Sequence, residues 1–206
     1  MGLFPMFLKL EGRPCLVVGA GRLGEEKTQS LLSAGAKVRV VAPQAMPGVV
    51  EWASAGRITW DARPYASADL DGVFMVIAAT SSVEVNDQVY QEARRRGVLC
   101  NVVDDPPRCD FYYPAVVRRG SLQIAISTAG RSPALAQRLR RELEAQFGPD
   151  YAGWVEYLGE QRARLRAQGA DIESRRRLLR EQAGHEGFES YRRELVAARK
   201  EDGDGR

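Results

Sequence analysis

The 206-residue sequence contains little of what several protein classes require. Three cysteines, Cys15, Cys100 and Cys109, are too few for a framework of disulfide pairs, and two of them lie in apolar runs where a free thiol behaves as a small hydrophobic residue. His185 is the only histidine, so the spacing typical of a zinc site is missing and we expect no resident metal. These shortages favour a reducing compartment, and we expect a cytoplasmic protein.

Long apolar runs are missing too. The first seven residues are mostly apolar, but Lys9, Glu11 and Arg13 follow too soon for a signal peptide or a membrane span. The net charge is only +3, and the stretch 131–199 interleaves Arg with Glu without the aromatic residues that stack on bases. We therefore expect a soluble globular protein that binds neither membranes nor nucleic acid.

The stretch 15–24, CLVVGAGRLG, carries the most informative motif of the chain. Gly19 permits a tight turn after a strand, Gly21 lets a pyrophosphate approach the backbone, and Gly24 lets the next helix pack close to the sheet. Glycines can also serve only to connect a strand to a helix, but the setting favours a dinucleotide-binding turn whose phosphates lie at the helix N-terminus. The cofactor contacts predicted in this turn are Gly19, Gly21, Arg22, Leu23 and Gly24.

Strand and helix patterns alternate through the first half of the chain. Strands are predicted at 15–18, 37–41, 58–60, 73–79 and 98–103, with helices at 25–34, 46–55 and 83–96 between them. This alternation implies right-handed βαβ crossovers and a parallel sheet whose ligands bind at the carboxyl ends of its strands. The predicted fold class is therefore α/β, with a Rossmann-like open parallel sheet.

The pattern changes after residue 110. Two short runs predict a β-hairpin, a helix follows from Pro133 to about Phe147, and three more helical patterns complete the chain. We predict three parts, a nucleotide-binding domain at 1–110, a hairpin-and-helix region at 111–149 and a helical domain at 150–206.

Three strand ends offer candidate site residues, two for the cofactor and one for catalysis. Pro43 follows the second strand where many NAD sites have an acid for the ribose, and no Arg follows it to bind a 2′-phosphate, so charge alone leaves NAD and NADP open. Ala79 and Thr80 end the fourth strand with small side chains on which a cofactor can lie, although Ser82 can equally be a plain helix cap. Asp104 and Asp105 end the fifth strand, either as catalytic acids or as turn formers ahead of two prolines.

These segments together resemble the precorrin-2 dehydrogenases of siroheme synthesis, which also form the N-terminal part of siroheme synthases. The similarity covers approximately residues 4–147 and depends on the order and spacing of several motifs, namely Phe4 to Phe7, Gly19 to Lys27, Ala78 to Thr80, Asn86, Asn101 to Asp104, Cys109 to Phe111, Pro114-Ala115 and Ser127 to Pro133. The helical end resembles the family only loosely.

The resemblance implies oxidation of precorrin-2 to sirohydrochlorin with NAD as hydride acceptor, in a homodimer whose dimerisation region is 111–149. Some members of the family also insert ferrous iron, and others carry a methyltransferase domain for which we expect no room here. Asp104 is the implied catalytic acid/base, with Asp105 as its rival. A non-catalytic NAD(H) sensor is the alternative function.

The substrate of that family is a polycarboxylate, and guanidinium groups pair well with carboxylates. Polar residues on the hairpin and before the next helix are therefore predicted to bind the tetrapyrrole, although Arg on a surface hairpin is more often only solvated. The predicted substrate-binding residues are Asp105, Arg118, Arg119, Ser127, Thr128, Arg131 and Ser132.

Overall fold

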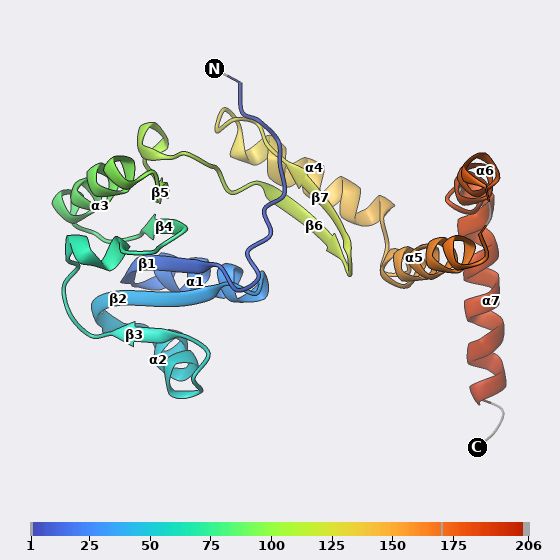
Figure 1. Ribbon diagram of the computed structural model, residues 1–206, viewed down its shortest axis with the longest axis horizontal. Coiled ribbons are helices and arrows are strands. Elements are labelled where there is room, and N and C mark those ends of the chain that lie inside the picture. The colour runs from blue at the N-terminus through green and yellow to red at the C-terminus, as the bar shows by residue number, and fades with distance from the viewer. Residues whose placement is uncertain (1, 170, 204–206) are drawn as a thin grey trace. The chain divides into compact units, whose positions relative to one another are not determined.

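The computed structural model describes residues 2–169 and 171–203, with side chains described as far as residue 197. Residues up to Tyr113 pack as one compact unit and residues from Pro114 onward as a second (Figure 1). Each unit is described by itself below. The finer division of the second unit at residue 149 stays a prediction.

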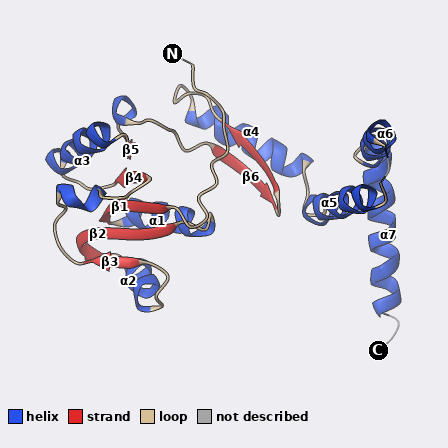
Figure 2. Cartoon of the chain, in the orientation of Figure 1, coloured by secondary structure: helices blue, strands red, loops and turns tan. Residues whose placement is uncertain are grey.

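The first unit is built on five parallel strands in the order β3-β2-β1-β4-β5 (Figure 2). The strands are β1 (Pro14–Ala20), β2 (Lys37–Ala45), β3 (Thr59–Asp61), β4 (Met75–Ala78) and β5 (Leu99–Val102). Chain order reverses between β1 and β4, and such a switch point is where doubly wound sheets bind their ligands. The predicted Rossmann-like fold is confirmed.

Helices cover both faces of this sheet. Val17 of β1 packs with Leu31 and Val49 on one face, whereas Leu16 packs with Val89 on the other. All of these side chains are buried, which explains why the strand is apolar at every position instead of alternating. The covering elements are α1 (Arg22–Ser33) and α2 (Pro47–Ser54) on the first face, and the 3-10 turn η1 (Ser67–Leu70) and α3 (Val83–Arg96) on the second.

Capping residues close in sequence determine where α3 begins and ends. The hydroxyl of Ser82 accepts a hydrogen bond from the Val85 N–H at 3.2 Å, and Gly97 ends α3 with a left-handed φ of 68°. Helix α1 starts three residues earlier than predicted, because the chain enters the helix directly after Gly21. The glycine motif therefore spans the last two residues of β1, the N-cap and the first turn of α1.

The second unit begins with an antiparallel hairpin of β6 (Ala115–Arg119) and β7 (Leu122–Ile126). Four helices follow, α4 (Pro133–Gln146), α5 (Tyr151–Ala167), α6 (Ile172–Gln182) and α7 (His185–Gly203). Tyr151, Trp154 and Phe188 join α5 to α7, with ring centroids 4.5 to 5.4 Å apart. The predicted hairpin and C-terminal helices are confirmed. In the described ranges, no helix combines the length and apolarity needed to cross a lipid bilayer.

Candidate active site

The three glycines of the motif, Gly19 in β1, Gly21 at the N-cap and Gly24 in α1, have different steric surroundings. A Cβ on Gly19 would lie 2.6 Å from the carbonyl oxygen of Ala79, and its φ of +97° is unfavourable for other residues. A Cβ on Gly24 would overlap the Gly19 carbonyl oxygen. These two glycines are therefore required by the fold itself, because they let the turn, β4 and α1 approach closely.

Gly21 is different because open space surrounds it. Nothing lies within 4 Å of a Cβ built there, and its backbone φ of −73° suits any residue. It is the N-cap of α1, and within the described residues no side chain caps this helix. The first N–H groups of α1 therefore have no side-chain acceptor from the cap, which is the arrangement that anions favour, and beside them Arg22 is exposed and Leu23 is half-buried.

The expected cofactor contact Pro43 lies near the carboxyl end of β2, which continues to Ala45 instead of ending before Pro43 as predicted. Pro43 is exposed there. Arg39 lies inside β2, where its Nε donates to Asp61 at 3.0 Å and its Nη2 to Asp69. Arg63 also binds Asp69, at 2.6 Å, and holds the pKa of that buried carboxyl below its usual range. Arg39 and Arg63 are thus both already paired with carboxylates.

Asn86 organises the loop that leaves β4. Its Oδ1 accepts hydrogen bonds from the N–H of Thr80 at 3.3 Å and from the Thr80 hydroxyl at 2.8 Å, while its Nδ2 donates to the Thr80 carbonyl at 3.1 Å. The polar groups of Thr80 are therefore directed toward α3. Ala79 is half-buried and its carbonyl faces Gly19, so the two strand ends that flank the switch point are in contact.

The turn after β5 presents two aspartates in different ways. Asp104 is exposed and has a left-handed φ of 62°, which is uncommon for a residue other than glycine. Asp105 is half-buried, and its carboxylate binds Arg108 at 3.1 Å. Across the described part of the chain, the carboxylate of Asp104 takes part in no ion pair or hydrogen bond.

The base of this turn is closed by hydrogen bonds between β5 and the segment that returns beside it. Asn101 forms an antiparallel bridge with Cys109, and the N–H of Cys100 donates to the Asp110 carboxylate at 2.9 Å. The Cys109 thiol lies 3.1 Å from the carbonyl oxygen of Val102, and burial raises its pKa, so it stays a neutral donor. The 3-10 turn η2 (Pro106–Arg108) completes the loop.

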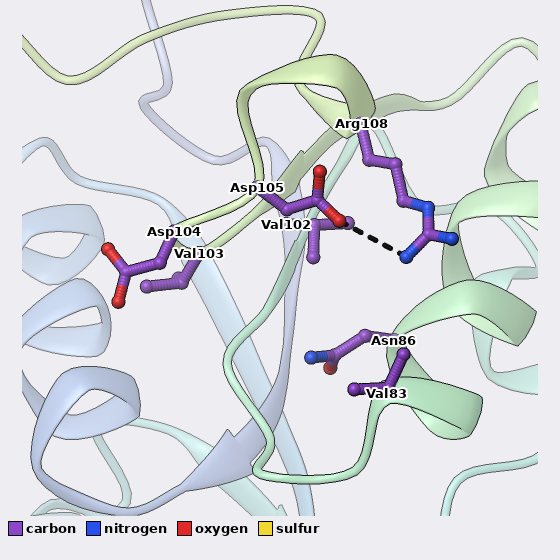
Figure 3. A pocket seen from close by; sticks show the side chains of 7 residues that line it. All are labelled: Val83, Asn86, Val102, Val103, Asp104, Asp105 and Arg108. Carbon is purple, nitrogen blue, oxygen red and sulfur yellow. Dashed lines mark hydrogen bonds and ion pairs between the residues drawn. The ribbon is translucent and has the colours of Figure 1, made fainter. Parts of the chain in front are cut away.

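A pocket of about 220 Å³ lies between this turn and the start of α3. Figure 3 shows Asp105 and Arg108 joined by their ion pair, with Asp104 pointing away from them and Asn86 on the wall formed by α3. The residues lining the pocket are Val83, Asn86, Val102, Val103, Asp104, Asp105 and Arg108. An unpaired carboxylate on a residue that lines a partly apolar pocket can accept a proton from a bound molecule.

Arg119, predicted to bind substrate in the second unit, already has structural contacts. It donates to the carbonyl oxygens of Phe147 at 2.8 Å and Glu144 at 3.1 Å, at the end of α4. Arg118 next to it is exposed. Both roles as substrate ligands stay predictions.

The hydroxyl groups in the turn before α4 accept hydrogen bonds from main-chain N–H groups of the same segment. Ser132 caps the helix by accepting from the Leu135 N–H at 3.3 Å, and the Thr128 hydroxyl accepts from the Ser132 N–H at 3.1 Å. The Ser127 hydroxyl accepts from the Ala129 N–H at 3.1 Å, while the side chain of Arg131 is exposed. Their substrate contacts remain predictions too.

Sequence reasoning missed two residues of the pocket wall. Asn86 was recognised only as part of a motif, and its six-residue distance from Thr80 was the available signal for a contact across the first turn of α3. Arg108 had no signal of its own beyond its position three residues after Asp105. Its second partner, Asp87, lies on another element and could not be inferred from spacing.

Comparison with known proteins places this geometry in a family. Residues 6–115 match the family model described as "Putative NAD(P)-binding", and residues 119–146 match the model of the sirohaem biosynthesis protein central domain. The chain belongs to this NAD(P)-binding family. Its first unit is thereby identified as the nucleotide-binding part, and the second match confirms the resemblance to proteins of siroheme synthesis.

Relatives and solved structures agree with this assignment. Siroheme synthase 3 of Aeromonas hydrophila is 41% identical over 177 residues, which cover 86% of this chain and 38% of the relative. Siroheme synthase 2 of Serratia proteamaculans is 41% identical over 187 residues, covering 90% and 40%. The chain thus spans less than half the length of these curated relatives. The solved structure of SirC, a precorrin-2 dehydrogenase, matches 97% of this chain and 100% of its own, with a TM-score of 0.81 and 26% identity.

Proposed function

We propose that this NAD(P)-binding protein is a precorrin-2 dehydrogenase that oxidises precorrin-2 to sirohydrochlorin with NAD⁺, and that Asp104 is its base. The observation that carries the proposal is the unpaired, exposed carboxylate of Asp104 at a pocket beside the carboxyl ends of β4 and β5. The likeness to SirC, which covers 97% of this chain and 100% of SirC, supports the choice of substrate. Homodimer formation and a cytoplasmic location stay predictions.

The reaction removes a hydride and a proton from the macrocycle, and the residues of the chain divide these tasks. NAD⁺ supplies the hydride acceptor. The N–H groups at the start of α1 would hold its pyrophosphate, and Gly21 leaves the space for it. Asn86 keeps the loop at Thr80 in place. The Asp104 carboxylate takes the proton, because Asp105 already accepts from Arg108.

Purified protein mixed with precorrin-2 and NAD⁺ tests the proposal. We expect the absorbance of sirohydrochlorin and of NADH to rise together. Asp104→Asn should lower kcat by about 100-fold or more with unchanged affinity for NAD⁺, since general base catalysis is typically worth that much. Asp105→Asn is the comparison and should lower kcat far less, because its amide oxygen can still accept the hydrogen bond from Arg108. Binding of NAD⁺ without any turnover would instead favour a non-catalytic sensor.

For the cofactor, we propose a preference for NAD⁺ over NADP⁺. A 2′-phosphate needs a free cationic side chain, and Arg39 and Arg63 are both engaged with Asp61 and Asp69. Calorimetric titration of both nucleotides gives the answer directly. Tighter binding of NADP⁺ would show that the proposal is wrong.

A second activity at the same site, insertion of Fe²⁺ into sirohydrochlorin, is favoured by the likeness to siroheme synthases. The macrocycle provides the four nitrogen ligands, so the protein need only hold it and accept the displaced pyrrole protons, which the unpaired Asp104 carboxylate can do. Wild type and Asp104→Ala are compared with sirohydrochlorin and Fe²⁺. Chelation that survives the substitution would exclude a shared base.

A further inference from the structure

Arg108 lies between two carboxylates that come from different elements. Its Nη1 is 3.1 Å from Asp105 in the turn after β5, and its Nη2 is 3.0 Å from Asp87 on α3. Figure 3 shows the first of these ion pairs beside the pocket. Between the turn at 104–108 and α3, Arg108 to Asp87 is the one ion pair in the part of the chain that the structure describes.

We propose that Arg108 is a positioning residue for the base Asp104. The bridge Asp87–Arg108–Asp105 ties the outer part of the turn to α3, and it occupies the Asp105 carboxylate so that Asp104 alone is left to accept a proton. This inference rests on the proposed function, because Asp104 has no catalytic task without it.

The backbone of the turn explains why a bridge is needed. Asp104 has a φ of 62°, a conformation that costs free energy for a residue with a Cβ and persists only where neighbouring contacts hold it. Cys109 and Asp110 hold the base of the turn through hydrogen bonds to β5, but neither of them contacts α3 through these bonds. Arg108 supplies the matching restraint on the side of α3.

The charges argue against Arg108 as a direct ligand of substrate carboxylates. Its guanidinium already faces Asp87 and Asp105, so the three groups together carry one negative charge. A substrate carboxylate would have to displace one of these partners and would meet the remaining acid and Asp104 nearby. A guanidinium with planar donors on two sides is well suited to joining two carboxylates at a fixed distance.

Steady-state kinetics with precorrin-2 and NAD⁺ test the inference in the full chain. We expect Arg108→Gln to lower kcat about tenfold, a loss within the range for a misplaced catalytic group, with KM for both substrates unchanged. Arg108→Lys should restore part of kcat because it keeps the charge but not the two-sided contact. Asp87→Ala should lower kcat less, and adding it to Arg108→Gln should cause no further loss, since the shared bridge is already gone.

Arg96→Gln is the matched control. Arg96 lies at the other end of α3 and likewise binds two carboxylates, those of Glu92 and Asp71. It should keep the kcat of the wild type. A wild-type kcat in Arg108→Gln would overturn the inference, as would a raised KM for precorrin-2 with unchanged kcat, which would make Arg108 a substrate ligand.

Amide hydrogen exchange of a peptide spanning 103–111 gives a readout that needs no activity. The N–H groups of Asp105 and Arg108 are bonded within the turn, and in Arg108→Gln we expect them to exchange about tenfold faster while the rest of the sheet is unchanged. Unchanged exchange would overturn the inference even if the wild type produced no NADH. A wild type without turnover but with faster exchange in the variant would refute the proposed function and leave Arg108 only as a restraint on the turn.

Discussion

The two units differ in how their predicted binding residues are used. In the first unit the turn after β1 is defined by space, because Gly19 and Gly24 leave no room for a Cβ while Gly21 leaves room that no protein atom fills. In the second unit the predicted residues have polar side chains, and Arg119 already binds the end of α4. The role of a glycine can therefore be judged from whether a Cβ would fit at its position. An arginine can be assigned to a ligand only after its contacts within the protein are known.

The largest effect is expected where the space is tightest. Gly19→Ala should destabilise the protein by about 3 kcal/mol, because the new Cβ meets the Ala79 carbonyl and the backbone is left-handed. Unfolding in urea measures this loss. Gly21→Ala is the control and should cost only about 1 kcal/mol or less, the usual difference between Gly and Ala at a helix N-cap. Equal losses in both variants would break the distinction between structural and ligand-facing glycines.

Gly21→Asp should leave the fold intact and abolish cofactor binding. Its carboxylate would fill the space in front of α1 and repel the pyrophosphate, so we expect affinity for NAD⁺ to fall by about 100-fold or more in calorimetric titration. Gly159→Asp in the second unit adds the same charge at a position where a Cβ also meets nothing, and it should bind NAD⁺ like the wild type. Retained affinity in Gly21→Asp would contradict a cofactor site at this turn.

Asn86→Asp should weaken NAD⁺ binding about tenfold. The substitution keeps the shape of the side chain but removes the Nδ2 donor and places a negative charge against the Thr80 carbonyl, so the loop after β4 loses its restraint. Gln88→Glu, the same chemical change at an exposed neighbour on α3, is the control. If both variants bind NAD⁺ equally well, the loop at Thr80 does not contribute to the cofactor site.

The smallest effect is expected in the second unit. Arg119→Gln should reduce the stability of that unit by about 1 kcal/mol, because the carbonyl groups at the end of α4 lose a charged donor, while affinity for NAD⁺ stays the same. Arg118→Gln changes an exposed side chain and should leave thermal unfolding unchanged. A raised KM for precorrin-2 in Arg118→Gln alone would identify the exposed arginine as the substrate ligand of the pair.

Most of the fold was predictable because its signals are local. Apolar strands with glycine at the following turn, and helices with Ser82 or Ser132 at their start, specify their own ends through short-range contacts. The start of α1 was predicted too late because the glycine motif itself enters the helix at Arg22. The parallel order of the strands then followed from the handedness of the crossovers.

The site was predictable only in part. The positions of Gly21 and Asp104 follow from strand ends, since ligands of such sheets bind there. The choice between Asp104 and Asp105 depends on Arg108, whose partner on α3 is distant in sequence. Contacts of this kind depend on side-chain geometry across elements, which residue spacing does not contain.

The return of the chain along β5 has a consequence for solubility. A strand at the edge of a sheet exposes unpaired N–H and C=O groups that can recruit a strand from another molecule. Here the Cys100 N–H donates to the Asp110 carboxylate, and the Asp110 N–H donates to the Cys100 carbonyl oxygen. The strand at the opposite edge, β3, is only three residues long. The loop that carries Asp104 is therefore also the cover of the edge at β5, so a substitution in this short stretch can change both the proposed site and the tendency to self-associate.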